Sequence, residues 1–165
     1  MGDGIAGAGN EAGAPSWPLH QRPGFLARRM HQIHVSLFSE LCGAFRITPL
    51  QYSLLSALQG VSEADQTTLA NAVALDRTTT TGALKRLAAR GLVTRAISAE
   101  DRRAQVCRIT AEGKALHAAM EAAAHEAHAR TVAALDPADQ ALLIRLLGQV
   151  IAGHDDRRSL AAPGG

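Results

Sequence analysis

The chain has 165 residues, a formal net charge of +2 at neutral pH and two cysteines, Cys42 and Cys107. This length fits one compact domain, and two thiols in unrelated segments exclude a disulfide-stabilised secreted scaffold and favour a reducing compartment. No apolar run approaches the roughly 20 residues that cross a bilayer, and no basic start precedes an apolar block as in a secretory signal, so we expect a cytoplasmic protein without membrane contact.

The two ends of the chain differ in composition from the middle. Met1–Ser16 and Gly153–Gly165 are rich in glycine and alanine, and they predict mobile tails because they have little to bury. We therefore expect one folded domain over 17–152. At its start, Trp17–Pro23 holds the only tryptophan, and we expect it to pack as an ordered arm.

Two helices are predicted next. Apolar residues recur at three- and four-residue spacing over Gly24–Ala44, which indicates an amphipathic helix. Its stripe comprises Leu26, Met30, Ile33, Leu37 and Leu41. Thr48-Pro49-Leu50-Gln51 is a capping box with proline at the first helical position, so a second helix should run from Pro49 to about Leu58.

The middle of the chain alternates short helices and strands. Asp65 and Asp76 are placed to cap two helices, and Gly91 fits a left-handed helix end. The expected elements are helices at Thr67–Ala74 and Arg77–Arg90, then strands at Leu92–Ile97 and Gln105–Ile109 with a polar loop between them. Two helices joined by a turn and followed by a hairpin predict a winged helix-turn-helix. The fold class is therefore mainly α with a small β-hairpin wing.

Two further helices complete the domain. Thr110 should cap an alanine-rich helix from Ala111 to about Ala134, and Asp136-Pro137 restarts the chain into a last helix. We expect that helix to bury Leu142, Leu143, Leu146, Leu147, Val150 and Ile151. A stripe of alanines buries little area by itself, so these outer helices need a partner, and a second copy of the chain is the simplest one.

Charge is concentrated in the winged region. Residues 76–108 carry eight basic and three acidic side chains, a net +5, whereas residues 111–152 carry a net −2. A positive block inside a nearly neutral chain is typical of a surface that binds phosphates. Double-stranded DNA is the partner that this block and the winged pattern indicate together.

Four consecutive threonines open the expected recognition helix. Thr is a mediocre helix former, but its hydroxyl can bond phosphates or base edges. The alternative is an ordinary solvated amphipathic helix with an unusual run of Thr. The predicted DNA contacts in this helix are Arg77, Thr78, Thr79, Thr80, Thr81, Lys85 and Arg86.

The loop between the strands supplies the other predicted DNA contacts. Asp101-Arg102-Arg103 occupies the tip, where a purely structural turn would favour Gly or Asn. An arginine on a projecting loop suits the negative potential of a narrow minor groove, so we predict that Arg102 and Arg103 contact DNA. A solvated charge run is the alternative.

These motifs together resemble the multiple-antibiotic-resistance regulator (MarR) family. The motifs are Leu69-Ala70, Asp76-Arg77-Thr78-Thr79, Leu87-x-x-Arg90-Gly91-Leu92-Val93-x-Arg95, Asp101-Arg102-Arg103 and Ile109-Thr110-x-x-Gly113. The resemblance implies a homodimer with a DNA-binding region at 48–110 and dimerisation helices at 17–47 and 111–152. It also implies that Thr67 and Thr68, at the start of the supporting helix, contact DNA where backbone amides meet a phosphate. It further implies repression from a palindromic operator, relieved when a small aromatic or anionic molecule binds between the dimer helices and the winged region.

The first helix is similar to that of family members that control aromatic-acid degradation, which implies an aromatic carboxylate or its thioester as effector. Arginine offers a bidentate fork for a carboxylate, and aromatic surface nearby suits a planar ring. The candidate ligand residues are Trp17, Arg22, Arg28, His31, His34, Phe38 and Tyr52. The alternative is that the arginines are solvated and that His31 and His34 satisfy a hydrogen bond between subunits.

Other functions are weighed against this one. His31-x-x-His34 and Glu121-x-x-x-His125-x-x-His128 could serve a metal sensor, and Cys107 beside Arg108 could serve a thiol sensor; we assign no metal ligands. A dimeric scaffold without DNA binding is a further alternative. The sequence has no Gly-rich phosphate loop, nucleophile elbow or paired catalytic carboxylates, so we expect neither enzymatic activity nor a cofactor.

Overall fold

The computed structural model describes residues 17–61, 63–98 and 105–161, with 156–161 described in backbone only. The helices are α1 (Pro23–Cys42), α2 (Pro49–Gln59), α3 (Gln66–Ala72), α4 (Arg77–Ala89), α5 (Ala111–Thr131) and α6 (Pro137–Ala161), and the strands are β1 (Ala64–Asp65), β2 (Val93–Ile97) and β3 (Gln105–Ile109). Short 3-10 turns occupy Leu19–Gln21 and Gly43–Phe45. The predicted fold class is confirmed.

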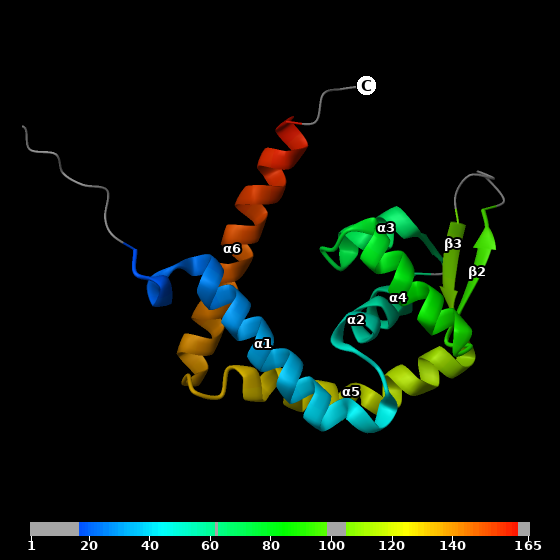
Figure 1. Ribbon diagram of the computed structural model, residues 1–165, viewed down its shortest axis with the longest axis horizontal. Helices are drawn as coiled ribbons and strands as arrows, with labels where there is room; N and C mark the ends of the chain where they lie inside the picture. The colour runs from blue at the N-terminus through cyan, green and yellow to red at the C-terminus, as the bar shows by residue number, and fades with distance from the viewer. Residues whose placement is uncertain (1–16, 62, 99–104, 162–165) are drawn as a thin grey trace, which may run out of the picture.

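The helices and strands form two regions. The winged lobe, which we define as α2, α3, α4 and the three strands, is gathered at one side, while α1 and α5 lie side by side and α6 projects from the opposite end (Figure 1). Within the described residues, no helix is long and apolar enough to cross a membrane.

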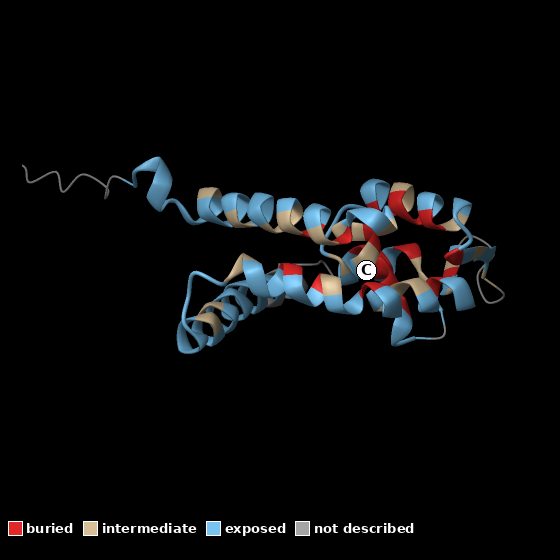
Figure 2. Ribbon diagram, turned by 90° about the horizontal axis from the view of Figure 1, so that it is seen from below, coloured by how far each residue is buried: buried red, intermediate tan, exposed pale blue. Residues whose placement is uncertain are grey.

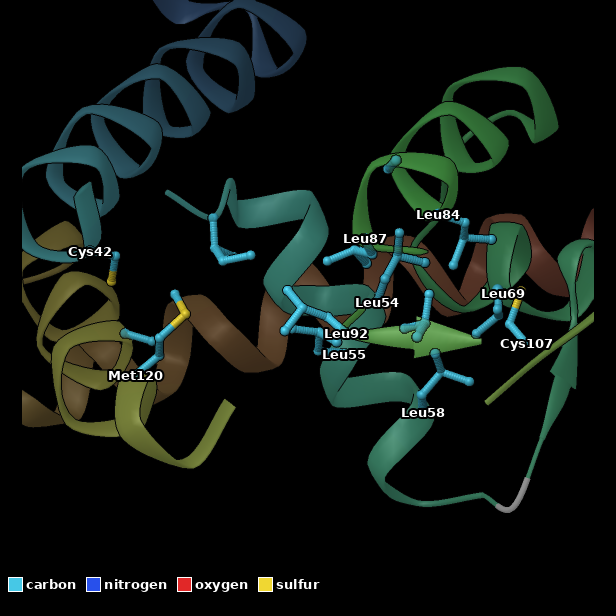
Figure 3. Close-up of a cluster of buried hydrophobic side chains, with 14 of the residues drawn as sticks. Cys42, Leu54, Leu55, Leu58, Leu69, Leu84, Leu87, Leu92, Cys107 and Met120 are labelled. Carbon is cyan, nitrogen blue, oxygen red and sulfur yellow. The ribbon is translucent and has the colours of Figure 1, made fainter. Parts of the chain in front are cut away.

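Leucines from several elements make the core of the winged lobe. Leu54, Leu55 and Leu58 of α2 meet Leu84 and Leu87 of α4 and are fully buried (Figure 3). The same core continues between α1 and α5 through Phe38, Cys42 and Met120. Buried residues gather in this lobe and beside it, whereas the outer ends of the long helices are exposed (Figure 2). The core is therefore continuous between the winged lobe and the α1–α5 pair.

The predicted helix caps are present, although α1, α3 and α5 end two to three residues earlier than expected. Thr48 and Gln51 form both hydrogen bonds of a capping box. Asp65 and Asp76 accept hydrogen bonds from the first-turn amides of α3 and α4, and Thr110 caps α5 in the same way. Gly91 has φ of 71°, in the left-handed region that favours glycine after a helix. The predicted caps are confirmed.

The sheet has three strands, where the sequence indicated two. The strand order is β1-β3-β2, all antiparallel, and Ala64 of β1 pairs with Cys107 of β3. A two-residue strand shows no alternation in sequence, because it exists only through its hydrogen bonds to β3. β1 ties the start of α3 to the base of the wing.

α6 departs from two predictions. The helix continues through Ala161, so the mobile tail expected from Gly153 is wrong over 153–161. One glycine inside a helix costs only about 1 kcal/mol, and no proline follows until Pro163. The expected burial is also wrong for the single chain, since Val150 is 61 % exposed and Ile151 60 %. Leu142, Leu146 and Leu147 are exposed as well.

The N-terminal arm and the first turns of α1 lie away from the core. Arg22 Nε donates to the Trp17 carbonyl at 2.9 Å, which closes the arm on itself, but Trp17 is 56 % exposed and the expected packing does not occur within one chain. Leu26 and Ile33, two members of the predicted α1 stripe, are exposed. The reason is that only the C-terminal half of α1 meets the core.

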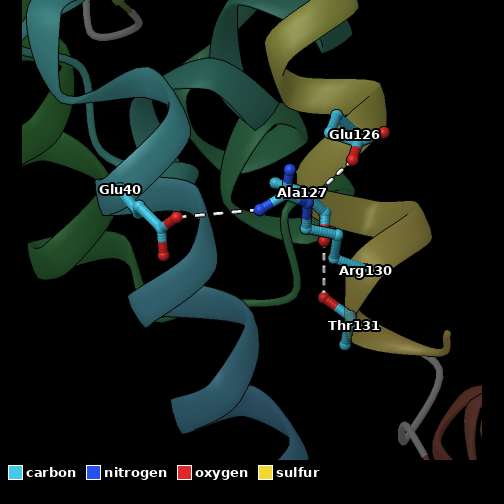
Figure 4. A network of polar contacts seen from close by, with 5 residues as sticks. All are labelled: Glu40, Glu126, Ala127, Arg130 and Thr131. Atoms are coloured by element: carbon cyan, nitrogen blue, oxygen red, sulfur yellow. Dashed lines mark hydrogen bonds and ion pairs between the residues drawn. The ribbon is translucent and has the colours of Figure 1, made fainter. Parts of the chain in front are cut away.

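A polar network joins α1 to the end of α5. Arg130 Nε contacts Glu126 at 2.7 Å and Arg130 Nη1 approaches Glu40 of α1 at 3.7 Å, while Thr131 Oγ1 donates to the Ala127 carbonyl (Figure 4). The charged groups are largely exposed, and exposed ion pairs contribute little to stability because water and salt screen them. The apolar contacts of α1 with α5, rather than these charges, hold the pair together.

Candidate nucleic-acid interface and ligand pocket

The outer face of α4 carries a groove rich in polar and basic side chains. It is lined by Arg77, Thr78, Thr81, Gly82 and Lys85. A Cβ added at Gly82 would meet only the end of the Arg86 side chain, at 3.6 Å, so a ligand backbone or base edge can approach closely here. Leu84 and Leu87 anchor the opposite face of α4 in the core.

The four threonines of α4 have different environments. Thr78 and Thr79 are exposed, and the Thr79 hydroxyl donates to Asp76 Oδ2 at 2.6 Å. That bond and the Thr79 amide hold the pKa of the Asp76 carboxyl below its usual range. Thr81 is half-buried and donates to Gln66 of α3.

Thr80 is fully buried, so its prediction as a DNA contact is wrong. Thr80 lies four residues before Leu84 and seven before Leu87, on the core face of the helix. The spacing to these two leucines was the sequence signal for its burial.

The buried hydroxyl of Thr80 should lower the stability of the protein. This hydroxyl has no hydrogen-bond partner among the described residues, and a buried unpaired hydroxyl costs about 1–3 kcal/mol. Thr80→Val keeps the side-chain shape, so we expect the free energy of unfolding to rise by about 1 kcal/mol in urea denaturation. Thr79→Val is the matched comparison, and it should destabilise because it removes a capping contact. A loss of stability in Thr80→Val would show that the hydroxyl is satisfied.

The start of α3 is organised differently from the prediction. The amides of Thr67 and Thr68 donate to Asp65 Oδ1 at 2.7 and 2.9 Å, and the Thr68 hydroxyl donates to Asp65 Oδ2. These bonds lower the pKa of Asp65. Because the carboxylate already occupies both amides, they are not available to phosphate, and that part of the prediction is wrong. Thr67 and Thr68 are nevertheless exposed.

The wing is described only at its base. Arg102 and Arg103 lie outside the described residues. Arg95 of β2 donates from Nη2 to Gln105 Oε1, and Gln105 also accepts from Gln66 Nε2 at 3.0 Å. The base of the wing is therefore joined by hydrogen bonds to α3, and through Gln66 to Thr81 of α4.

A second hollow lies between α1, α5 and α6, with a volume of about 340 Å³. Its lining is mostly apolar, with Leu143, Ile144 and Leu147 from α6, and its polar side chains include His31, His34 and His128. This volume and an apolar lining with a few polar groups are typical of small-molecule sites. The structure thus brings His31 and His34 of the predicted set into one pocket.

A row of rings leads from this pocket toward α2. His128 stacks on His34 with centroids 4.6 Å apart, His34 lies 6.0 Å from Phe38, and Phe38 lies 5.9 Å from Tyr52. Tyr52 stacks in turn on His117 at 4.6 Å. Phe38 and Tyr52 are therefore connected to the pocket through His34, although neither lines it.

The hydrogen bonds of His34 set its tautomer. Thr131 Oγ1 donates to the Ala127 carbonyl, so it accepts from His34 Nδ1 at 3.1 Å. Burial lowers the pKa of His34, and the nearby charges of His128 and His31 lower it further. The lowered pKa favours the neutral imidazole, and the bond to Thr131 places the proton on Nδ1 and leaves Nε2 as an acceptor.

Three predicted ligand residues lie elsewhere in the single chain. Trp17 and Arg22 stay in the exposed arm, and the Arg28 guanidinium sits 5.7 Å over the Phe25 ring. None of the three lines the pocket. His128 and Thr131 were missed as ligand candidates, although both lie beside the Ala124–Ala127 stripe of α5, a spacing that the sequence shows.

The structure also bears on the sensor alternatives. Cys42 and Cys107 are fully buried, and burial raises the pKa of both thiols, with Arg95 only partly opposing this at Cys107. A raised pKa disfavours the reactive thiolate, so Cys107 does not have the setting of a thiol sensor. Among the described residues, no group of three or more His, Cys, Asp or Glu side chains is placed to hold a metal ion.

Known proteins resemble this chain in sequence and in structure. A MarR family model matches residues 47–104. The HTH-type transcriptional repressor NicR of Pseudomonas putida is 29 % identical over 135 residues, covering 82 % of this chain and 85 % of NicR. Both the family model and a relative matched over most of its length therefore point to a transcriptional regulator.

Solved structures agree with these matches. BpsR of Bordetella bronchiseptica, whose DNA binding is regulated by 6-hydroxynicotinic acid, superposes with a TM-score of 0.76 at 28 % identity over 82 % of this chain and 96 % of BpsR. The PcaV transcriptional regulator of Streptomyces coelicolor superposes with a TM-score of 0.67 at 30 % identity over 82 % of this chain and 98 % of PcaV. With its winged lobe, its basic α4 groove and these relatives, the chain belongs to the MarR family of DNA-binding transcriptional regulators.

Proposed function

We propose that this chain acts as a homodimeric repressor that binds a palindromic operator and is released by a small aromatic carboxylic acid or its thioester. It acts by binding rather than by turnover. The observation that carries the proposal is the basic, open groove of α4 on the winged lobe, in a chain that also has an apolar pocket between α1, α5 and α6. In this proposal the dimerisation segments are 17–47 and 111–152, and the DNA-binding region is 48–110.

The DNA contacts that we propose follow from exposure and charge. Arg77, Lys85 and Arg86 are exposed bases on α4, and Thr78 and Thr81 line the groove between them. A recognition helix places such side chains in the major groove. Arg102 and Arg103 are proposed to enter the adjacent minor groove, where the negative potential attracts arginine.

The proposed dimer rests on α6. Its exposed leucines, isoleucines and valine make an apolar face that nothing covers within the described part of the chain, and monomers rarely expose such a continuous face. A two-fold dimer covers it with the same face of a second copy. Two recognition helices would then contact half-sites roughly 34 Å apart on one side of the duplex.

The salt dependence of binding tests the DNA interface. Each phosphate contact contributes about one unit to the slope of log affinity against log salt. Because a dimer carries every substitution twice, Lys85→Ala or Arg77→Ala should flatten the slope by about two units in band-shift titrations on the protein's own promoter. Arg145→Ala on α6 removes the same charge far from the groove and is the control. An unchanged slope in both groove variants would place the interface elsewhere.

The effector proposal rests on the pocket between α1, α5 and α6. Its apolar lining suits a planar ring, and the imidazoles of His31, His34 and His128 can donate to or accept from polar substituents. Regulation of BpsR by 6-hydroxynicotinic acid supports a heteroaromatic or aromatic acid for this chain also. Such a ligand would act by favouring one spacing of the two winged lobes.

Sensing and DNA binding should be separable by substitution. A ligand that binds only the native state at 100 times its Kd stabilises by about 2.7 kcal/mol, so benzoate, protocatechuate and 6-hydroxynicotinate can be screened by thermal shift. His34→Leu and His31→Ala should abolish the shift of any hit and leave operator affinity within about two-fold. Lys85→Ala should weaken operator binding and leave the thermal shift unchanged. Full response in both histidine variants would show that the effector binds outside this pocket.

A further inference from the structure

A chain of hydrogen bonds runs from the base of the wing into the recognition helix. Arg95 Nη2 donates to Gln105 Oε1, Gln66 Nε2 donates to the same oxygen at 3.0 Å, and Thr81 Oγ1 donates to Gln66 Oε1 at 3.0 Å. Gln66 is buried at the start of α3. The chain therefore links β2, β3, α3 and α4, four elements that meet in the winged lobe (Figure 1).

The direction of every bond in this chain follows from its first member. A guanidinium has donors and no acceptor, so Gln105 must present its oxygen to Arg95. Gln66 must then present its NH₂ group to that oxygen, because two carbonyl oxygens would repel. This leaves the Gln66 oxygen facing Thr81, and the Thr81 hydroxyl has to donate its only hydrogen inward.

The Thr81 hydroxyl can consequently accept further hydrogen bonds but cannot donate another. A hydroxyl has one donor and two acceptor lone pairs, and its donor is spent on Gln66. Thr81 lines the exposed α4 groove beside Gly82, where the added-Cβ position is open. Thr79 is restricted in the same way, because the Asp76 carboxylate can only accept its hydrogen. Toward any further partner, both hydroxyls can therefore act only as acceptors.

Base edges differ in what they offer to such an acceptor. In the major groove, adenine N6 and cytosine N4 are amino donors, whereas guanine O6 and N7, thymine O4 and every phosphate oxygen accept. An acceptor-only hydroxyl gains from an amino group and meets repulsion at the other sites. A threonine with a free hydroxyl hydrogen would make no such distinction.

We propose that Thr81 is a specificity-determining residue that selects an adenine or cytosine amino group in each operator half-site, because the Arg95–Gln105–Gln66 chain turns its hydroxyl hydrogen inward. Gln66 and Gln105 are positioning residues in this scheme. The inference rests on the proposed placement of α4 in the major groove. It separates the roles of the groove residues, with Arg77 and Lys85 supplying affinity through phosphates and Thr81 supplying discrimination.

The first experiment removes the amino group from the DNA. Sites are selected from a random duplex library with the full-length protein, and each adenine or cytosine of the selected site is replaced in turn by purine or 2-pyrimidinone, which lack the exocyclic amine. At one position per half-site we expect the wild type and Thr81→Ser to lose about five-fold in affinity. Thr81→Val should lose nothing further at that position. Equal losses of affinity for Thr81→Val and the wild type at every position would overturn the proposal. A flattened salt slope in Thr81→Val with unchanged base preference would also overturn it, because that is the behaviour of a phosphate contact.

The second experiment changes the chain without touching Thr81. Gln105→Leu removes the acceptor that orients Gln66, so the Thr81 hydroxyl can turn outward, and the preference for the amino base over guanine or thymine should fall to within about two-fold. Gln105→Glu is the matched control, because a carboxylate accepts from both Arg95 and Gln66 and keeps the direction of the chain. Ratios of affinities are compared, since the added charge weakens binding to all DNA. An unchanged preference in Gln105→Leu, with native circular dichroism, would show that the chain does not orient Thr81.

Failure of the proposed function has a different signature. If the wild type selects no sequence from the library at 50–200 mM salt, the chain is not a sequence-specific DNA-binding protein and both proposals fall. If it selects a site that shows no coupling to Thr81, only the present inference is wrong.

Discussion

Gly113→Ala should strongly lower the free energy of unfolding of this protein. A Cβ at Gly113 would lie 2.1 Å from the Leu92 carbonyl oxygen and 2.9 Å from Ile109 Cγ1. The first of these atoms belongs to the backbone, so no side-chain rotation relieves the clash. We expect a loss of more than about 4 kcal/mol, the range reached by overpacking and broken hydrogen bonds together.

The surrounding hydrogen bonds explain why the backbone cannot move aside. Leu92 O accepts from the Thr110 amide at 3.1 Å, and the Gly113 amide donates to Thr110 Oγ1 at 3.0 Å. Moving α5 away from β2 would break this cap and also the Thr110 hydroxyl bond to the Gly91 carbonyl. The glycine of the Ile109-Thr110-x-x-Gly113 motif therefore allows α5 to start directly against the strand that precedes the wing.

Urea denaturation followed by circular dichroism measures this effect. Domains of this kind have only about 5–15 kcal/mol of stability, so Gly113→Ala should unfold at much lower urea concentration or fail to fold. Gly43→Ala is the control, because an added Cβ there meets no atom within 4 Å and the backbone is right-handed. Similar midpoints for the two variants would show that α5 and β2 are not in close contact.

Charged residues introduced on the apolar face of α6 should dissociate the proposed dimer and thereby weaken operator binding. Ile144 and Ile151 are seven residues apart on one helical face and are 66 % and 60 % exposed in the single chain. In a two-fold dimer, Ile144→Glu with Ile151→Glu buries four carboxylates against apolar surface, and each unpaired buried charge costs several kcal/mol. We expect a monomer at micromolar concentration by light scattering.

The same variant should lose at least about 100-fold in operator affinity. Two linked recognition helices gain a factor of roughly 10²–10⁴ over one, because the second contact becomes intramolecular. Arg145→Gln with Gln149→Glu changes the net charge by the same −2 and is the control, since these exposed side chains lie off the apolar stripe. A glutamate variant that remains a dimer and binds its operator normally would show that α6 does not form the interface.

The candidate site was partly accessible from the sequence. The exposed bases Arg77, Lys85 and Arg86 and the pocket histidines His31 and His34 were all identified from residue type and helical position. The burial of Thr80 follows from its spacing to Leu84, so the sequence held that information although the run of four threonines obscured it. The stacking of His128 on His34 joins residues 94 positions apart, and no local sequence pattern predicts this contact.

What the sequence by itself determined are the features that depend on neighbours within a few positions. The caps at Thr48, Asp65, Asp76 and Thr110 and the left-handed Gly91 were predictable because each is satisfied inside one turn of chain. β2 and β3 were predictable for the same reason, since a hairpin pairs strands that are close in sequence.

Only the tertiary structure decided the features that depend on contacts between distant segments. β1 exists because Ala64 and Asp65 pair with β3, and the direction of the Thr81 hydroxyl is set by Arg95, Gln105 and Gln66 on three other elements. The burial of α1 and α6 could not be derived from their apolar periodicity. An apolar stripe predicts that one face of a helix is buried, but it does not identify the surface that contacts it. Within one chain, α5 covers the C-terminal half of α1 and leaves the outer face of α6 open.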